Sequence, residues 1–150
     1  MAAIDYAGVL TSLKALLDAD SRTNDARTYI EEDPQYGLSD SGKVIVLTLN
    51  RRSATAGQSL AAGKRQRYLL SVGVWSVAFD MASFDAAAAK RDALLAQVEL
   101  VLMDNRTLSG KVVALNLTGG EFFSVRNPEG TVFTAMAETV IEAEVSAINT

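Results

Sequence analysis

The segment that most resembles a chemical signature is Gly37-Leu38-Ser39-Asp40-Ser41-Gly42-Lys43, whose glycine and lysine spacing matches a phosphate-binding loop. In that motif a serine or threonine follows the lysine and holds magnesium, but Val44 occupies this position. Such a loop also follows a strand and opens a helix, whereas Pro34 precedes this one and a strand-forming run follows it. We therefore predict no nucleotide binding here.

Two pairs of acidic residues have spacings that occur in metal and hydrolase sites. Asp18 and Asp20 could begin a calcium loop, but Arg22 stands where the third ligand belongs. Glu142 and Glu144 share one face of a strand, as paired glycosidase carboxylates can, although a solvated strand face has the same spacing. The chain has no histidine and no cysteine, which excludes imidazole bases, thiolate zinc sites and disulfides. We predict no metal, no cofactor and no enzymatic activity.

Five basic residues gather around a long segment of small and polar residues, at about positions 51–64. That segment is far longer than an ordinary hairpin connection of about two to five residues, so we predict a loop that is mobile in the free subunit. A hairpin would bring its basic flanks together, where they could contact an acidic partner surface or line a passage for DNA. The alternative is a solubilising edge that discourages aberrant strand pairing. The candidate assembly contact comprises Arg51, Arg52, Lys64, Arg65 and Arg67.

Length and charge limit the broad class of protein. A chain of 150 residues predicts a single domain, 1–150, with a real core. Its net charge of −4, with both signs interspersed, favours neither nucleic acid nor an anionic membrane. No apolar run approaches the roughly 20 residues that span a bilayer, so we expect no membrane association and a soluble chain in a reducing cytoplasm.

Apolar periodicity predicts a helix near the N-terminus, three strands, a second helix and three further strands. We read this order as an α+β domain with a mixed, largely antiparallel sheet and both helices packed on one face. Gly119-Gly120 predicts a tight hairpin between two of the last strands, and a second hairpin follows at Asn127-Pro128-Glu129-Gly130. The predicted strands are Thr28–Ile30, Lys43–Asn50, Arg65–Phe79, Lys111–Thr118, Glu121–Arg126 and Phe133–Ala147.

The helix from Ser83 to about Asp104 is the longest periodic segment, and the sheet is expected to pack on it. Ser83 is a natural N-cap, and Asp85 suits the positive end of the helix dipole. The expected buried stripe is Phe84, Ala87, Ala88, Leu94, Leu95, Val98, Val101 and Leu102.

Two predicted strands, Lys43–Asn50 and Arg65–Phe79, are apolar on both faces, which is typical of strands covered on both sides. The two helices cover only one face of the sheet. The other face is covered either by the sheet curling on itself or by a neighbouring subunit, since large exposed apolar patches usually mark interfaces.

In layout and length the chain resembles the tail terminator, or tail-completion, proteins of long-tailed bacteriophages, the minor tail protein U-like family. The likeness covers nearly the whole chain. It lies in the N-terminal helix, in KVIVLTLN and RQRYLLSVGVWSVAFD with a loop between them, in DAAAAKRDALLAQVELVLMD, and in the closing LTGGEFFSVRNPEGTVF.

The resemblance implies a structural virion protein, assembled in the host cytoplasm, that forms a hexameric ring on the finished tail. Such a ring stops polymerisation of the tail tube protein and presents the docking surface for the head-tail connector protein, with DNA only passing through without sequence-specific contact. Two alternatives stay open: a head-tail connector subunit, and a small-molecule-binding or enzymatic α+β domain with an apolar pocket between the central helix and the sheet.

Overall fold

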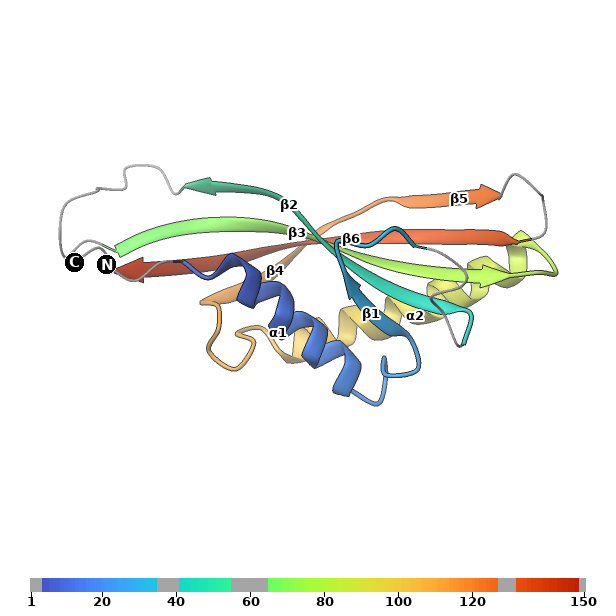
Figure 1. Ribbon diagram of the computed structural model, residues 1–150, viewed down its shortest axis with the longest axis horizontal. Helices are drawn as coiled ribbons and strands as arrows, with labels where there is room; N and C mark the ends of the chain where they lie inside the picture. Colours follow the sequence, from blue (N-terminus) through green and yellow to red (C-terminus); the bar gives the residue numbers. More distant parts are fainter. Residues whose placement is uncertain (1–3, 35–40, 55–64, 127–131, 149–150) are drawn as a thin grey trace.

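A computed structural model describes residues 4–34, 41–54, 65–126 and 132–148. These residues form two helices and a sheet in the expected order, and the fold is α+β (Figure 1). The elements are α1 (Tyr6–Ala19), β1 (Arg27–Ile30), β2 (Lys43–Ala54), β3 (Arg65–Asp80), α2 (Phe84–Asp104), β4 (Ala114–Gly119), β5 (Phe122–Arg126) and β6 (Phe133–Ile148).

Strand pairing confirms a mixed, largely antiparallel sheet. The strand order is β1-β2-β3-β6-β4, with β5 also paired to β6. β1 runs parallel to β2, and the remaining pairs are antiparallel. The long strand β6 pairs along its whole length with β3, from Asp80↔Phe133 to Arg65↔Ile148.

Both helices pack on one side of this sheet, which we call the helix face (Figure 1). Because strand residues alternate between faces, the core takes alternate residues from part of β2, β3 and β6. The core is formed by Val9, Leu10, Leu13 and Leu17 of α1, Leu94, Val98, Val101 and Leu102 of α2, Ile45 and Leu47 of β2, Leu70, Val72 and Val74 of β3, and Ile141, Ala143 and Val145 of β6, with smaller contributions from the connections.

The predicted boundaries and cap of α2 are confirmed. The Ser83 hydroxyl accepts a hydrogen bond from the backbone N–H of Ala86 at 3.1 Å, and the helix ends at Asp104. Five residues of the expected stripe are buried, whereas Phe84, Ala88 and Leu95 are half-buried. Leu95 lies beside Phe122 of β5 rather than over the middle of the sheet. Lys90 of α2 is also half-buried and bonds the carboxylate of Asp80 at 3.1 Å.

The expected hairpin at Gly119-Gly120 is wrong. β4 and β5 do not pair with each other but follow one another along the same edge of β6. Gly119 has a φ of +119°, and a Cβ on Gly120 would lie 1.6 Å from the carbonyl oxygen of Glu138. The register shifts between Leu117 and Gly119, so a bulge interrupts the edge there, and Gly120 lets the backbone pass β6 at close range. β5 and β6 do form an antiparallel pair as expected, and the turn at 127–130 lies outside the described residues.

The segment 51–64 was expected to be a loop, but β2 continues through Arg51–Ala54 as a paired strand, from Arg51↔Ser71 to Ala54↔Tyr68. Its sequence has no strand pattern, and the partner strand β3 holds it in place. The rest of that expected loop, residues 55–64, lies outside the described residues, as does most of the phosphate-loop-like segment.

Candidate assembly surface

The acidic residues whose spacing occurs in metal and hydrolase sites make structural contacts instead. Asp20 accepts hydrogen bonds from Arg22, whose guanidinium lowers the pKa of Asp20 to about 2. Asp18 accepts from Lys14 and from the backbone N–H of Thr28. Glu144 lies 3.6 Å from the guanidinium of Arg67. Within the described residues, no three acidic side chains converge into a metal site.

Arg52 lies on the helix face, because it is opposite Leu70 of the core. Its guanidinium donates to the hydroxyl of Tyr6 at 3.0 Å and lies 5.5 Å and 5.4 Å from the rings of Tyr6 and Tyr68. This contact raises the pKa of Arg52 further above its ordinary value. Arg52 thus ties the start of α1 to the sheet.

The other predicted basic residues do not join Arg52. Arg51 alternates to the opposite face of β2, and Arg67 lies on that face beside Glu144. Arg51 pairs with Ser71, four residues along β3 from Arg67, which is roughly 13 Å. Lys64 lies outside the described residues, and only the backbone of Arg65, opposite Ile148, is described. The five residues therefore do not form one cluster on one face.

A surface cavity of about 420 Å³ lies where β2 passes the start of α1. Leu49 and Leu70 provide apolar surface, and the two arginines lie beside them. Its lining residues are Tyr6, Leu49, Asn50, Arg51, Arg52 and Leu70.

The face of the sheet that carries no helix, the outer face, holds a second, smaller core. Val44, Val46, Val77 and Phe79 are at most 3% exposed there. Tyr29 of β1 and Val132 pack against them, so the chain covers part of this face itself. We expected the outer face to be covered either by the sheet itself or by a neighbouring subunit. Residues of the same chain cover part of it.

The apolar surface of the outer face continues past this core to the margin of the sheet. Trp75 packs on Phe123 with ring centroids 5.6 Å apart, and Met136 lies half-buried on the same face. Phe123 and Val125 of β5 are exposed. The outer face therefore grades from a covered core into an uncovered apolar margin.

This margin, formed by β4 and β5 and called the β4–β5 edge, is the feature that the sequence interpretation missed. Treating Gly119-Gly120 as a hairpin hid that both segments lie in line along β6. The only signal in the sequence was the run Phe122-Phe123-Ser124-Val125, which puts apolar side chains on both faces of a short strand. The exposed large apolar residues of the edge are Leu117 at 39%, Phe122 at 63%, Phe123 at 38% and Val125 at 47%.

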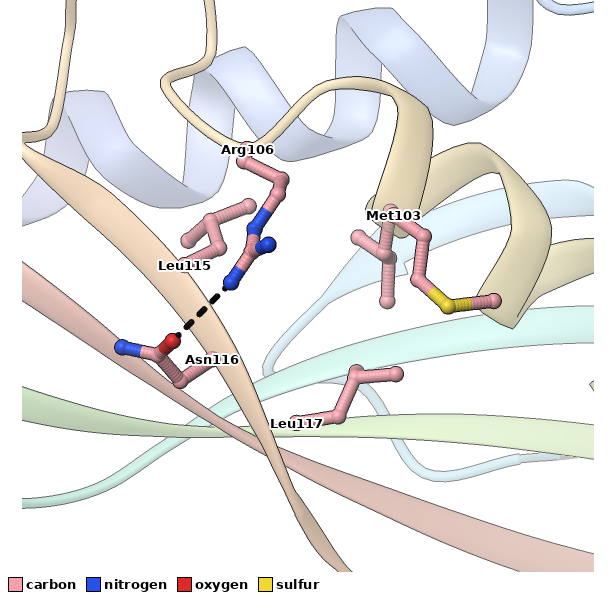
Figure 2. Close-up of a pocket in the computed structure, with 6 residues that line it drawn as sticks. Met103, Arg106, Leu115, Asn116 and Leu117 are labelled. Carbon is pink, nitrogen blue, oxygen red and sulfur yellow. Dashed lines mark hydrogen bonds between the residues drawn. The ribbon is translucent and has the colours of Figure 1, made fainter.

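Two cavities lie between this edge and α2. One, of about 230 Å³, is lined by Leu102, Met103, Leu115 and Leu117, with Arg106 and Asn116 bonded to each other at 3.2 Å across it (Figure 2). The other, of about 430 Å³, holds Leu95, Glu99 and Phe122, and the guanidinium of Arg91 lies 4.9 Å from the Phe122 ring. Both belong to the surface beside the edge, not to the space between α2 and the centre of the sheet.

Neither described helix is long and apolar enough to cross a membrane.

Comparison with known proteins gives a distant structural similarity. No protein-family model and no curated protein matches the chain. Among solved structures, the chain is similar to a chain of a structure described as "Virion of native gene transfer agent (GTA) particle", with 15% sequence identity and a TM-score of 0.49. The similarity covers 95% of this chain and 100% of that chain.

Proposed function

We propose that this protein is a structural subunit of a bacteriophage tail, a terminator that assembles as a ring on the finished tail tube, stops its growth and provides the head-docking surface. The observation that carries the proposal is the uncovered, apolar β4–β5 edge of the sheet. Exposed apolar strand edges are sites of pairing with another chain. The resemblance of layout to tail terminator proteins supplies the specific role.

The described cavities give little support to a small-molecule or enzymatic role. The cavity in Figure 2 holds about 230 Å³, below the roughly 300–1,000 Å³ of typical ligand sites. The two larger cavities, of about 420 and 430 Å³, fall within that range but are hollows on the surface and do not enclose a ligand-sized space. Its polar groups, Arg106 and Asn116, already bond each other. With no histidine or cysteine in the chain, the groups that most often act as bases or nucleophiles are absent too. We accordingly propose no catalytic role and no cofactor.

The proposed partners are copies of this chain, the tail tube protein and a head-tail connector protein. Passing DNA would meet the ring without sequence-specific contacts. The net charge of −4, and the glutamates Glu138, Glu142 and Glu144 on the outer face of β6, favour a surface that does not hold nucleic acid tightly.

Electron microscopy of the purified protein, alone and with tail tubes, tests this function. We expect rings of six copies of the 16.0 kDa chain, at the ends of tubes or in concentrated solution. In a lysate lacking its terminator, the added protein should restore tails of uniform length. A protein that stays monomeric at millimolar concentration and leaves tube ends bare would contradict the proposal. Binding to connector complexes but not to tubes would favour the connector alternative.

A further inference from the structure

The β4–β5 edge presents an unpaired strand edge of unusual composition. From Ala114 to Arg126 the chain runs along β6, and its other side has no strand partner among the described residues. Natural proteins usually protect such edges with lysine, proline or inward-pointing charges. Between Ala114 and Val125 this edge has one charged residue, Glu121, and no lysine or proline. A bulge between Leu117 and Gly119 interrupts this edge.

The opposite margin of the sheet has a second unpaired edge. β1 is short and pairs only with Val44–Leu47 of β2. Glu31, with a φ of 52°, turns the chain away, and its carboxylate accepts a hydrogen bond from the N–H of Leu49 at 2.7 Å. Beyond this point, residues 50–54 of β2 have no outer strand partner in the described part of the chain.

These two edges are complementary in charge and shape. Residues 50–54 contain two arginines and no acid, whereas Glu121 lies midway along the β4–β5 edge and the one base of that edge, Arg126, stands at its end. The 420 Å³ cavity beside Arg51 and Arg52 has an apolar floor, Leu49 and Leu70, and the β4–β5 edge projects exposed apolar side chains. Pairing between two β4–β5 edges would bring Glu121 toward its own copy and would leave the arginine edge unused.

We propose that the β4–β5 edge of one subunit pairs with residues 50–54 of β2 in a second copy of this chain, so that the sheet continues from subunit to subunit. The two edges lie on opposite margins of the sheet, so one subunit can make both contacts at once. A contact between different surfaces is heterologous, and repeated rotation closes it into a ring. This inference rests on the proposed ring-forming function and specifies the contact that builds the ring.

The absence of cysteine allows a direct test by site-specific cross-linking. Val125→Cys in β5 and Ser53→Cys in β2 both introduce a thiol on the outer face at an exposed position. When the two variants are mixed with a short bis-maleimide, at millimolar concentration or on tail tubes, we expect cross-linked dimers. Each variant alone should give few. Ala15→Cys, on the exposed side of α1, replaces Ser53→Cys in the control mixture.

Two double variants, one at the edge and one as a control, test the same contact without cross-linking. Leu117→Lys with Val125→Lys adds two lysines to the β4–β5 edge, while Leu100→Lys with Met81→Lys adds them to equally exposed apolar positions elsewhere. We expect both proteins to melt within a few degrees of the parent, since exposed substitutions change stability little. Only the edge variant should lose ring formation, seen by sedimentation and electron microscopy.

A milder test uses the complementary charges. Glu121→Arg should weaken association by roughly fivefold or less, as expected for an exposed ion pair. Association should largely recover when the Glu121→Arg protein is mixed with an Arg51→Glu protein, or when one chain carries both substitutions. In either case the positive and negative charges across the contact have exchanged places.

The outcomes separate the contact from the function. Dimers of Val125→Cys alone, equal cross-linking with Ala15→Cys, or rings formed by the edge variant would overturn the proposed contact, even where the protein still caps tails. Mixed cross-links in a protein that leaves tails uncapped would uphold the contact and overturn the terminator function. No association of the parent chain, together with no cross-links in the mixture of the two cysteine variants, would overturn both.

Discussion

The two faces of the sheet carry similar runs of valine, leucine and isoleucine, yet they are covered in different ways. On the helix face, α1 and α2 bury a continuous core whose central residues, such as Leu13, Leu17 and Leu47, have no exposed surface. On the outer face, the buried cluster is small and ends at Trp75 and Met136, beyond which Phe123 and Val125 are exposed. The difference separates two roles, because one face supplies most of the folding energy and the other leaves apolar area for association.

Polar side chains around Gly73, in the middle of the outer face, add to this difference. A Cβ on Gly73 would lie 2.7 Å from the carboxylate of Glu138 and 2.7 Å from the hydroxyl of Thr48. Glycine at this position makes room for polar side chains that cover the middle of the outer face, with Asn50 beside them. The apolar part of the outer face is thereby confined to the end of the sheet that carries β5.

The largest effect should come from the centre of the helix face. Leu13→Ala removes a fully buried side chain from the contact between α1 and the sheet, and we expect a loss of about 2–5 kcal/mol in the free energy of unfolding. Urea denaturation followed by circular dichroism measures this loss. Ala15→Gly, on the exposed side of the same helix, should cost only about 1 kcal/mol through helix propensity. Equal losses would mean that α1 does not bury its leucines.

A smaller effect is expected from the core of the outer face. Val46→Ala removes two methyl groups from the smaller cluster, and we expect a loss of about 1–2 kcal/mol in the same measurement. Val125→Ala, at the exposed margin, should stay within about 0.5 kcal/mol of the parent. A loss for Val46→Ala as large as that for Leu13→Ala would remove the energetic difference between the two faces.

Local patterns in the sequence predicted the elements that depend on local chemistry. The Ser83 cap, the length of α2 and the alternation of β6 follow from hydrogen bonding and periodicity within each segment, and the structure confirms them. The double apolarity of β2 correctly indicated that Val44 and Val46 need cover, since both lie in the outer-face core.

The parts that failed depend on contacts between distant segments. Gly120 is required by the approach to Glu138, eighteen residues away, so the glycine pair looked like a local turn. Arg51–Ala54 become a strand because β3 offers unpaired backbone, which no pattern within those four residues reveals. The grouping of basic residues failed for a related reason: alternation along the extended strand sends Arg51 and Arg52 to opposite faces.

A modest effect is expected from the polar contact that joins α2 to the end of β3. Lys90 bonds the carboxylate of Asp80 and the carbonyl oxygen of Phe79, and its side chain is 40% exposed. Lys90→Met keeps most of the aliphatic stem but removes the ion pair, so we expect a loss of about 1 kcal/mol or less. Thermal unfolding at low and high salt measures this loss of stability. As salt rises, the parent should lose the stability that the ion pair contributes, and the difference between parent and variant should shrink. A loss comparable to that of Leu13→Ala would show that ion pairs, not apolar contacts, hold the helix face together.

The smallest effect concerns the stability of the fold at low pH, and it arises at the C-terminal end of α1, which Arg22 links to the C-terminal end of α2. Arg22 bonds Asp20 at 3.0 Å and Asp104 at 2.7 Å, which joins the C-terminal ends of the two helices. Because the hydrogen bonds from Arg22 lower the pKa of Asp20 from 3.8 to about 2, folding favours the ionised carboxylate. The stabilisation is therefore fully present above about pH 4 and is lost as the pH falls through about 2.

Asp20→Asn removes this titration while keeping an oxygen that can accept from Arg22. We expect the free energy of unfolding of the variant to fall less steeply than that of the parent between about pH 4 and pH 2, with the two curves parallel at higher pH. Identical slopes for the parent and Asp20→Asn would show that Arg22 does not hold this carboxylate ionised in solution, and the two helix ends would then depend on their apolar contacts with the sheet alone.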